Sequence, residues 1–171
     1  MISISPWFAR VFHFGLEPEY FPLVLERLIG TRPRLDALLA GASTVSLLDR
    51  PGGAWSIQQH VGHLADLDPL WFGRVDDILS GAPEMRPADL LNRATDAADH
   101  NDRTLEEVLG SFTELRHRFT ERLAGLDLRD VVRASDHPRL KQPMRIIDLA
   151  VFVAEHDDHH LATIRQRLIV S

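Results

Sequence analysis

The sequence predicts an all-α protein, a four-helix bundle with an N-terminal arm and long connections between the helices. Four long stretches repeat apolar residues every three or four positions, which is the period of an amphipathic helix. No segment alternates apolar and polar residues convincingly, so strands are not predicted. The chain has 171 residues, 44% of them apolar, and no cysteine. This length suits a single domain over residues 1–171 that buries its core without disulfide bonds.

The first predicted element is an arm, and the first helix follows it. Residues 1–18 are rich in aromatic side chains and are expected to pack across the bundle. A helix is predicted from Glu19 to Ala40, with a break at residues 30–33. Thr31 can cap a second helical segment there, and Pro33 is tolerated in the first turn of that segment.

The next two helices carry the clearest start signals. After a turn-rich link over residues 43–54, Ser56 begins a helix that runs to Leu79, and Gln59 stands at the capping-box position. A long polar connection covers residues 82–103. The third helix, Leu105 to Leu123, has Thr104 as its N-cap and Glu107 three residues later.

The last helix follows a second polar link. This link covers residues 127–143, and the helix is predicted from Met144 to Leu168. Four long amphipathic stretches joined by links of unequal length are typical of a helix bundle.

Charge and hydropathy exclude several classes of function. The formal net charge is -6, with acidic and basic residues interspersed, so no basic face for nucleic acid is predicted. No stretch reaches eighteen apolar residues, and the N-terminus lacks the pattern of a signal peptide. We therefore expect no membrane partner and a cytoplasmic location.

Two histidines of the last helix stand where a bundle normally has leucine or isoleucine. His156 and His160 share one stripe with Val153 and Ile164, and their spacing of four stacks the two imidazoles one turn apart. A lone histidine on an apolar face is more often a hydrogen-bonded core residue. Two at this spacing favour a metal site, because a metal satisfies buried imidazole nitrogens. His159 is predicted at the rim of the stripe.

The second helix offers two histidines for a third ligand. Its apolar stripe includes Ile57, Leu64 and Trp71, and periodicity places His60 near the middle of the stripe and His63 at its edge. Periodicity alone would choose His60, although a metal site shared by two helices near an opening of the bundle could use either histidine.

The sequence resembles the DinB-like (DinB/YfiT) superfamily over residues 19–168. The resemblance is carried by Trp55-Ser56 followed by His63-Leu64, by Glu155-His156-Asp157-Asp158-His159-His160-Leu161, and by the Gly30-Thr31-Arg32-Pro33 break and the Pro51-Gly52-Gly53 turn. Members of this bacterial superfamily are four-helix bundles that hold a metal on one histidine of the second helix and a His-x-x-x-His pair of the last. The resemblance thus implies a metal site of His63, His156 and His160, with His60 as a neighbour.

The resemblance also implies a divalent metal, most simply zinc or nickel, and an enzyme. Three histidines leave a coordination position open, so a metal-bound water is the candidate nucleophile. The implied reactions are hydrolysis and thiol-dependent transfer of a small-molecule substrate. Because the chain has no cysteine, a thiol would have to come from a low-molecular-weight cofactor. The resemblance further implies a homodimer.

Two alternatives to an enzyme remain from the sequence. One is a non-catalytic metal-binding protein of a stress or DNA-damage response, and the other is a structural helical protein with packed histidines. Around the site, Asp66, Glu155 and Asp148 are candidates for holding a ligand imidazole, whereas Asp157 and Asp158 are expected to face solvent or cap His159.

Four further side chains have two possible readings. Trp7, Trp55 and Trp71 can wall a pocket, although core packing is more common for aromatic residues. Arg74 could meet an anionic substrate, but it is expected on the helix surface.

Overall fold

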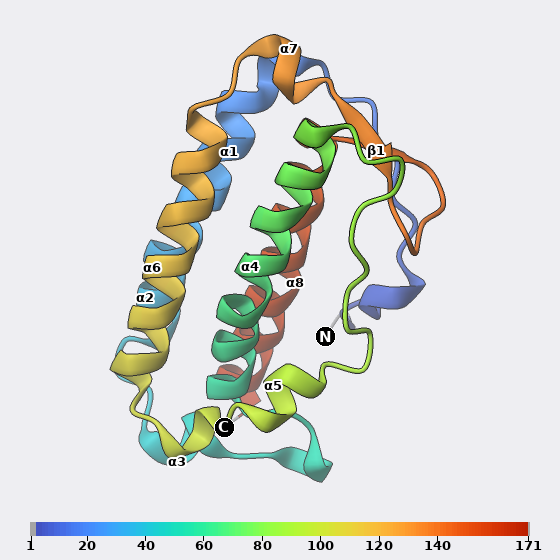
Figure 1. The fold of residues 1–171 in the computed structure, drawn as a ribbon. Coiled ribbons are helices and arrows are strands. Elements are labelled where there is room, and N and C mark those ends of the chain that lie inside the picture. Colours follow the sequence, from blue (N-terminus) through green and yellow to red (C-terminus); the bar gives the residue numbers. More distant parts are fainter. Residues whose placement is uncertain (1–2, 171) are drawn as a thin grey trace.

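The computed structural model describes residues 3–170, and within them the long helices stand side by side as a bundle (Figure 1). The four helical columns are α1 (Phe21–Ile29) continued by α2 (Thr31–Leu39), α4 (Ile57–Ser80), α6 (Leu105–Ala124) and α8 (Ile146–Val170). The predicted four-helix bundle is confirmed, with helix ends within a few residues of those expected.

The packing order of the columns explains the long connections. α4 packs against α6 and α8, and α1 packs against the same two helices. The first column therefore stands diagonally opposite α4, and α6 stands diagonally opposite α8, so the chain must cross over within each of these pairs. The consecutive helices α4 and α6 are neighbours. The crossovers and links hold short elements: α3 (Thr44–Leu48), η3 (Pro51–Gly53), α5 (Arg93–Ala97), η4 (His100–Asp102) and α7 (Leu128–Val131).

Two predicted helix starts are confirmed atom by atom. The Ser56 side chain accepts from the backbone N–H of Gln59, whose side chain accepts from the backbone N–H of Ser56, and Thr104 and Glu107 form the same capping box. The prediction for Thr31 is wrong, because Gly30 is the N-cap of α2. The Thr31 hydroxyl donates instead to Asp157 Oδ2 over 2.7 Å.

A small hairpin in the last link is a departure from the prediction of no strands. β1 (Ala134–Asp136) pairs antiparallel with β2 (Pro143–Arg145), which leads directly into α8. Strands of three residues are too short to show alternation in the sequence, so the pattern could not have indicated them.

The N-terminal arm packs on the bundle as expected. Its short 3-10 helix η1 (Trp7–Ala9) lies beside the hairpin and the connection between α4 and α5 (Figure 1). The Trp7 ring is 5.1 Å from the ring of Phe152 on α8. The partner of this arm is thus the last helix, near its histidines.

A polar layer divides the apolar core into two clusters. Each of the four columns contributes one residue to it: Thr31, Asp68, Arg116 and Asp157, all at most 3% exposed. Arg116 donates to both carboxylates, so the charges are paired and hydrogen-bonded. The expectation that Asp157 faces solvent is wrong: this residue is fully buried.

Among residues 3–170, no helix combines the length and the apolar character needed to cross a bilayer.

Candidate metal centre

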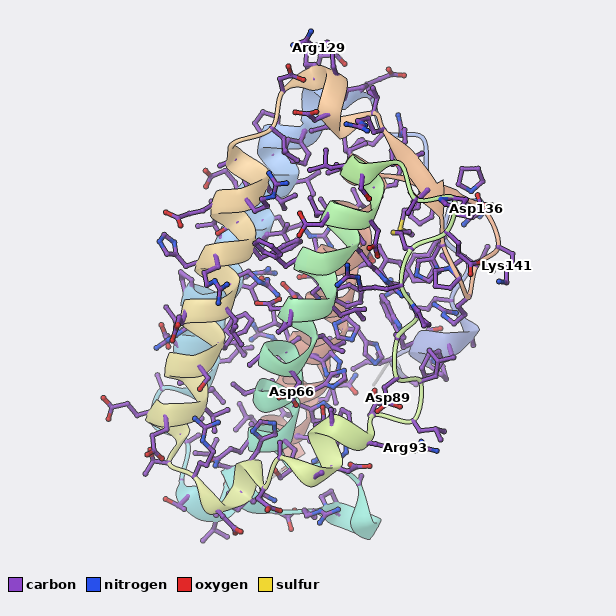
Figure 2. All side chains as sticks on the ribbon, in the orientation of Figure 1. Asp66, Asp89, Arg93, Arg129, Asp136 and Lys141 are labelled. Carbon is purple, nitrogen blue, oxygen red and sulfur yellow. The ribbon has the colours of Figure 1, made fainter. Side chains whose placement is uncertain are left out.

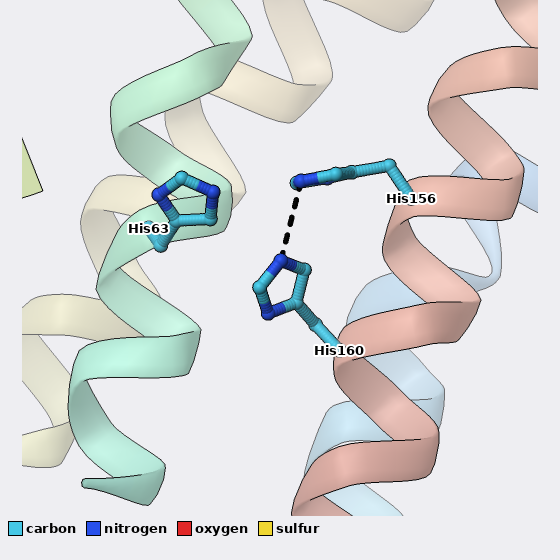
Figure 3. A group of neighbouring side chains, drawn as sticks. All are labelled: His63, His156 and His160. Carbon is cyan, nitrogen blue, oxygen red and sulfur yellow. Dashed lines mark hydrogen bonds between the residues drawn. The ribbon is translucent and has the colours of Figure 1, made fainter. Parts of the chain in front are cut away.

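The structure brings His63, His156 and His160 together at the same height in the bundle as the polar layer. His63 projects from α4 toward the other two, which project from successive turns of α8 (Figure 3). One nitrogen of each ring lies within 4.8 Å of one from each of the others, and all three side chains are at most 5% exposed. The Nε2 atoms of His156 and His160 are 3.2 Å apart.

The geometry of the three rings fits a divalent ion. At Zn–N distances of about 2.0–2.1 Å, the nitrogens of a tetrahedral site lie roughly 3.3 Å from one another. The pair on α8 already has this spacing, and a nitrogen of His63 lies within 4.8 Å of both. Nδ1 of His156 is buried and has no hydrogen-bond partner among residues 3–170, so the ring nitrogen that faces His160 makes this histidine's one side-chain hydrogen bond there.

The imidazoles are held in the neutral form that binds metals. Burial lowers the pKa of His63 to about 4. Asp66 opposes this shift, and His100 adds to it, both with smaller effects. Burial also lowers the pKa of His156 and His160 well below the usual value, and their neighbouring histidines add to the effect. No proton has to be displaced from a charged ring at neutral pH before an ion binds.

His60 lies beside this group and not within it. Its Nδ1 is 2.9 Å from Nδ1 of His160, a hydrogen bond that occupies the nitrogen of His160 facing away from His156. This contact fixes the His160 ring with Nε2 directed at the group. His63, at the edge of the apolar stripe, is the histidine of α4 that meets the pair.

The His63 ring is fixed from behind by the connection between α4 and α6. Its Nδ1 is 2.9 Å from the Thr95 hydroxyl, which donates to Asp66 Oδ2 over 2.7 Å. Nε2 of His100 is 2.9 Å from the same carboxylate oxygen. Because a Cβ at Gly62 would collide with the His100 ring, the glycine permits this close approach.

The three candidate acidic residues differ in their partners. Asp66, on α4 (Figure 2), reaches His63 through Thr95. Glu155 pairs with Arg10 and Arg27, and the buried Asp148 pairs with Arg145, so these two carboxylates bind arginines and not a ligand imidazole. Asp158 is half-buried and pairs with arginines of α1 and α2. Thr95 had no sequence signal, because it lies in a connection predicted to be irregular.

A cavity of about 390 Å³ opens beside the three histidines. The three tryptophans line it, which decides between the two readings of these residues. The Trp55 ring is 4.7 Å from that of His63, and the rings of Trp7 and Trp71 are 5.0 and 5.8 Å from that of His156. The volume is in the range of small-molecule sites.

The far end of the cavity is polar. Arg74, His137 and Arg139 line it, together with Phe8 and Pro138. The expectation of a surface position for Arg74 is wrong, because this side chain is 1% exposed. Neither His137 nor Arg139 had a sequence signal, since both lie in the turn of the short hairpin.

Comparisons with known proteins agree with this architecture. A model of the DinB superfamily matches residues 27–164. The fold is similar to that of YfiT from Bacillus subtilis, described as a probable metal-dependent hydrolase with an unusual four-helix bundle topology. The TM-score is 0.78 at 22% identity, over 92% of this chain and 91% of YfiT. The comparison with curated proteins gave no match. Since the family match spans most of the chain, the protein belongs to the DinB superfamily.

Proposed function

We propose that the protein is a divalent-metal-dependent hydrolase, in which His63, His156 and His160 hold the ion. The observation that carries this proposal is the position of the three histidines at the wall of a cavity of about 390 Å³. A purely structural ion needs no such space beside it, whereas a substrate does.

The donor set favours an ion with an open position. Structural zinc sites normally fill four positions with protein ligands, and catalytic sites use three. Neutral imidazoles suit zinc and nickel, and the chain has no cysteine to supply thiolate. A bound ion would supply Lewis acidity, activating water or polarising a substrate carbonyl.

The chain's own residues orient the ligands and shape the cavity. Thr95 accepts from Nδ1–H of His63, which leaves Nε2 of that ring free to face the ion. His60 fixes His160 in the same way. The rings of Trp7, Trp55 and Trp71 surround the site with apolar surface that limits the access of water.

The likeness to YfiT, described as a probable metal-dependent hydrolase, supports testing hydrolysis first. Thiol-dependent transfer is the second reaction to test, with the thiol supplied as a low-molecular-weight cofactor. The family resemblance also supports a homodimer, which light scattering on purified protein would test.

A substrate screen on untagged protein tests the proposal. Small esters and amides are assayed with and without a low-molecular-weight thiol, before and after chelation, and after addition of zinc or nickel. We expect turnover that is lost on chelation, restored by metal and absent from His63→Ala. His117→Ala is the matched control, because His117 is exposed and its imidazole pairs with Glu121 on the same helix, away from the cavity. A fully metal-loaded protein without turnover across the panel would instead favour a non-catalytic metal-binding protein.

A further inference from the structure

Several hydrogen-bond donors at the polar end of the cavity have no acceptor among residues 3–170. Arg74 Nε donates to the backbone carbonyl of Arg86, but within residues 3–170 no carboxylate forms an ion pair with Arg74. The nearby Asp77 pairs with Arg86 instead. A guanidinium that is 1% exposed thus lacks the counter-ion that a buried charge ordinarily has.

His137 adds a second donor at the same place. The backbone N–H groups of Arg139 and Leu140 both donate to His137 Nδ1, over 3.2 and 3.1 Å. The ring proton of the neutral imidazole therefore belongs on Nε2. That atom is 3.1 Å from Arg74 Nη1, which is also an N–H donor. Two donors meet here, and an acceptor placed between them would satisfy both.

Arg139 provides a third unsatisfied donor. Its Nη2 is buried and has no hydrogen-bond partner in the described part of the chain, while its guanidinium stacks over the Phe8 ring at 5.3 Å. Burial and the neighbouring Arg139 and Arg86 lower the pKa of Arg74 to about 10, although Asp77 opposes this effect. Both arginines remain charged at neutral pH.

Among the described residues, the cavity lining contains one acidic residue, Asp89, which forms no ion pair with Arg74 or Arg139. Asp89 is exposed, in the connection between α4 and α5 (Figure 2). Its carboxylate accepts from the backbone N–H groups of Leu91 and Arg93. The positive charge at the polar end is therefore left for a ligand to neutralise.

We propose that Arg74, His137 and Arg139 form an oxyanion-binding subsite for a carboxylate group of the substrate. The Arg74 guanidinium carbon is 5.3 Å from the Trp71 ring, which is 5.8 Å from the His156 ring. One aromatic ring therefore separates the subsite from the candidate metal centre. The substrate class is a small carboxylate with an apolar middle, whose reacting group lies at the histidines. The placement of the reacting group rests on the proposed function, whereas the binding of the anion does not.

Binding of a matched pair of ligands to metal-free protein tests the subsite. 3-Phenylpropionate and 3-phenylpropionamide differ in charge but little in shape, and without metal the carboxylate has no ion to coordinate. Tryptophan fluorescence reports binding, because all three tryptophans line the cavity. At pH 7.5, in buffer without phosphate or sulfate, we expect the carboxylate to bind roughly tenfold more tightly than the amide.

Variants then locate the preference. Arg74→Gln and Arg139→Gln should each remove most of the preference for the carboxylate. If Arg74→Gln does not fold, the result with Arg139→Gln is the test. Lys141→Gln removes the same charge from the same hairpin turn, but Lys141 points outward to Glu84 (Figure 2), so the preference should persist. His63→Ala should also keep it, which separates this subsite from the metal proposal. Equal binding of the two ligands, no binding of the carboxylate at millimolar concentration, or an equal loss in Lys141→Gln would overturn the subsite.

Discussion

Arg116 on α6 pairs with Asp157 on α8, the residue that directly follows His156. The same guanidinium binds Asp68 on α4, and Thr31 donates to Asp157 from the other side. The buried charges and the histidine group therefore occupy one level of the bundle, between two apolar clusters. Residues of this layer set the position of α8 and, with it, the direction of His156.

Replacement of Arg116 is expected to destabilise the protein strongly. Arg116→Gln would leave Asp68 and Asp157 buried without their shared cation, and removal of one partner from a buried pair costs about 3–5 kcal/mol. The free energy of unfolding in urea measures this. Arg118→Gln is the control, since Arg118 is exposed on the same helix and should change stability by less than about 0.5 kcal/mol. Similar losses in the two variants would argue against a structural role for the layer.

The sequence predicted the bundle because its signals are local. The capping boxes at Ser56 and Thr104, and the long apolar stripes, depend on neighbours within a few residues. Burial of Asp157 depends instead on Arg116, which is 41 residues away in the chain. In the sequence, a buried aspartate that is paired with a residue of another helix looks the same as an aspartate that faces solvent. The expectation that Asp157 faces solvent was therefore wrong.

The candidate site was predictable only in part for the same reason. The spacing of His156 and His160 is local to one helix, and periodicity was enough to place them on the core face. His63 required the family resemblance, because a small rotation of α4 decides between it and His60. Thr95 and His137 come from connections without regular periodicity, and only the fold brings them to the cavity.

Metal content should distinguish the two histidines of α4. We expect untagged protein to bind one divalent ion, and His63→Ala, His156→Ala or His160→Ala to lose most of it, because each removes a direct ligand. His60→Ala removes only a hydrogen bond to His160 and should retain the ion with lower affinity. Elemental analysis after dialysis gives the stoichiometry. Full metal content in His63→Ala, or a complete loss in His60→Ala, would reverse the assignment.

Thr95 is expected to tune the metal site without touching the ion. Thr95→Val keeps the shape but removes the oxygen that holds Nδ1 of His63, so metal affinity should fall about 10–100-fold. Competition with a chromophoric chelator measures the affinity. Thr120→Val is the matched control, because its buried hydroxyl bonds only to carbonyls of its own helix. The same loss of affinity in both variants would indicate a general effect on folding.

His137 should make the stability of the protein depend on pH. Burial, with the charges of Arg74 and Arg139, lowers its pKa from 6.5 to about 3 in the folded state. Between these values the unfolded chain binds more protons, so stability is full above pH 6.5 and declines as pH falls. From pH 7.5 to 5.0 we expect His137 to account for a loss of about 1 kcal/mol, which is about half of the full linkage between a pKa of 6.5 and one of about 3.

The measurement is the difference in the free energy of unfolding between pH 7.5 and 5.0, on metal-free protein. The other buried histidines contribute equally to wild type and to His137→Asn, so their effects cancel in the comparison. The variant should lose about 1 kcal/mol less than wild type over this range, while His117→Asn, at an exposed position, should behave as wild type does. An unchanged pH dependence in His137→Asn would mean that the fold does not lower the pKa of this imidazole. It would contradict a neutral ring whose Nδ1 accepts from the two backbone N–H groups of the hairpin turn.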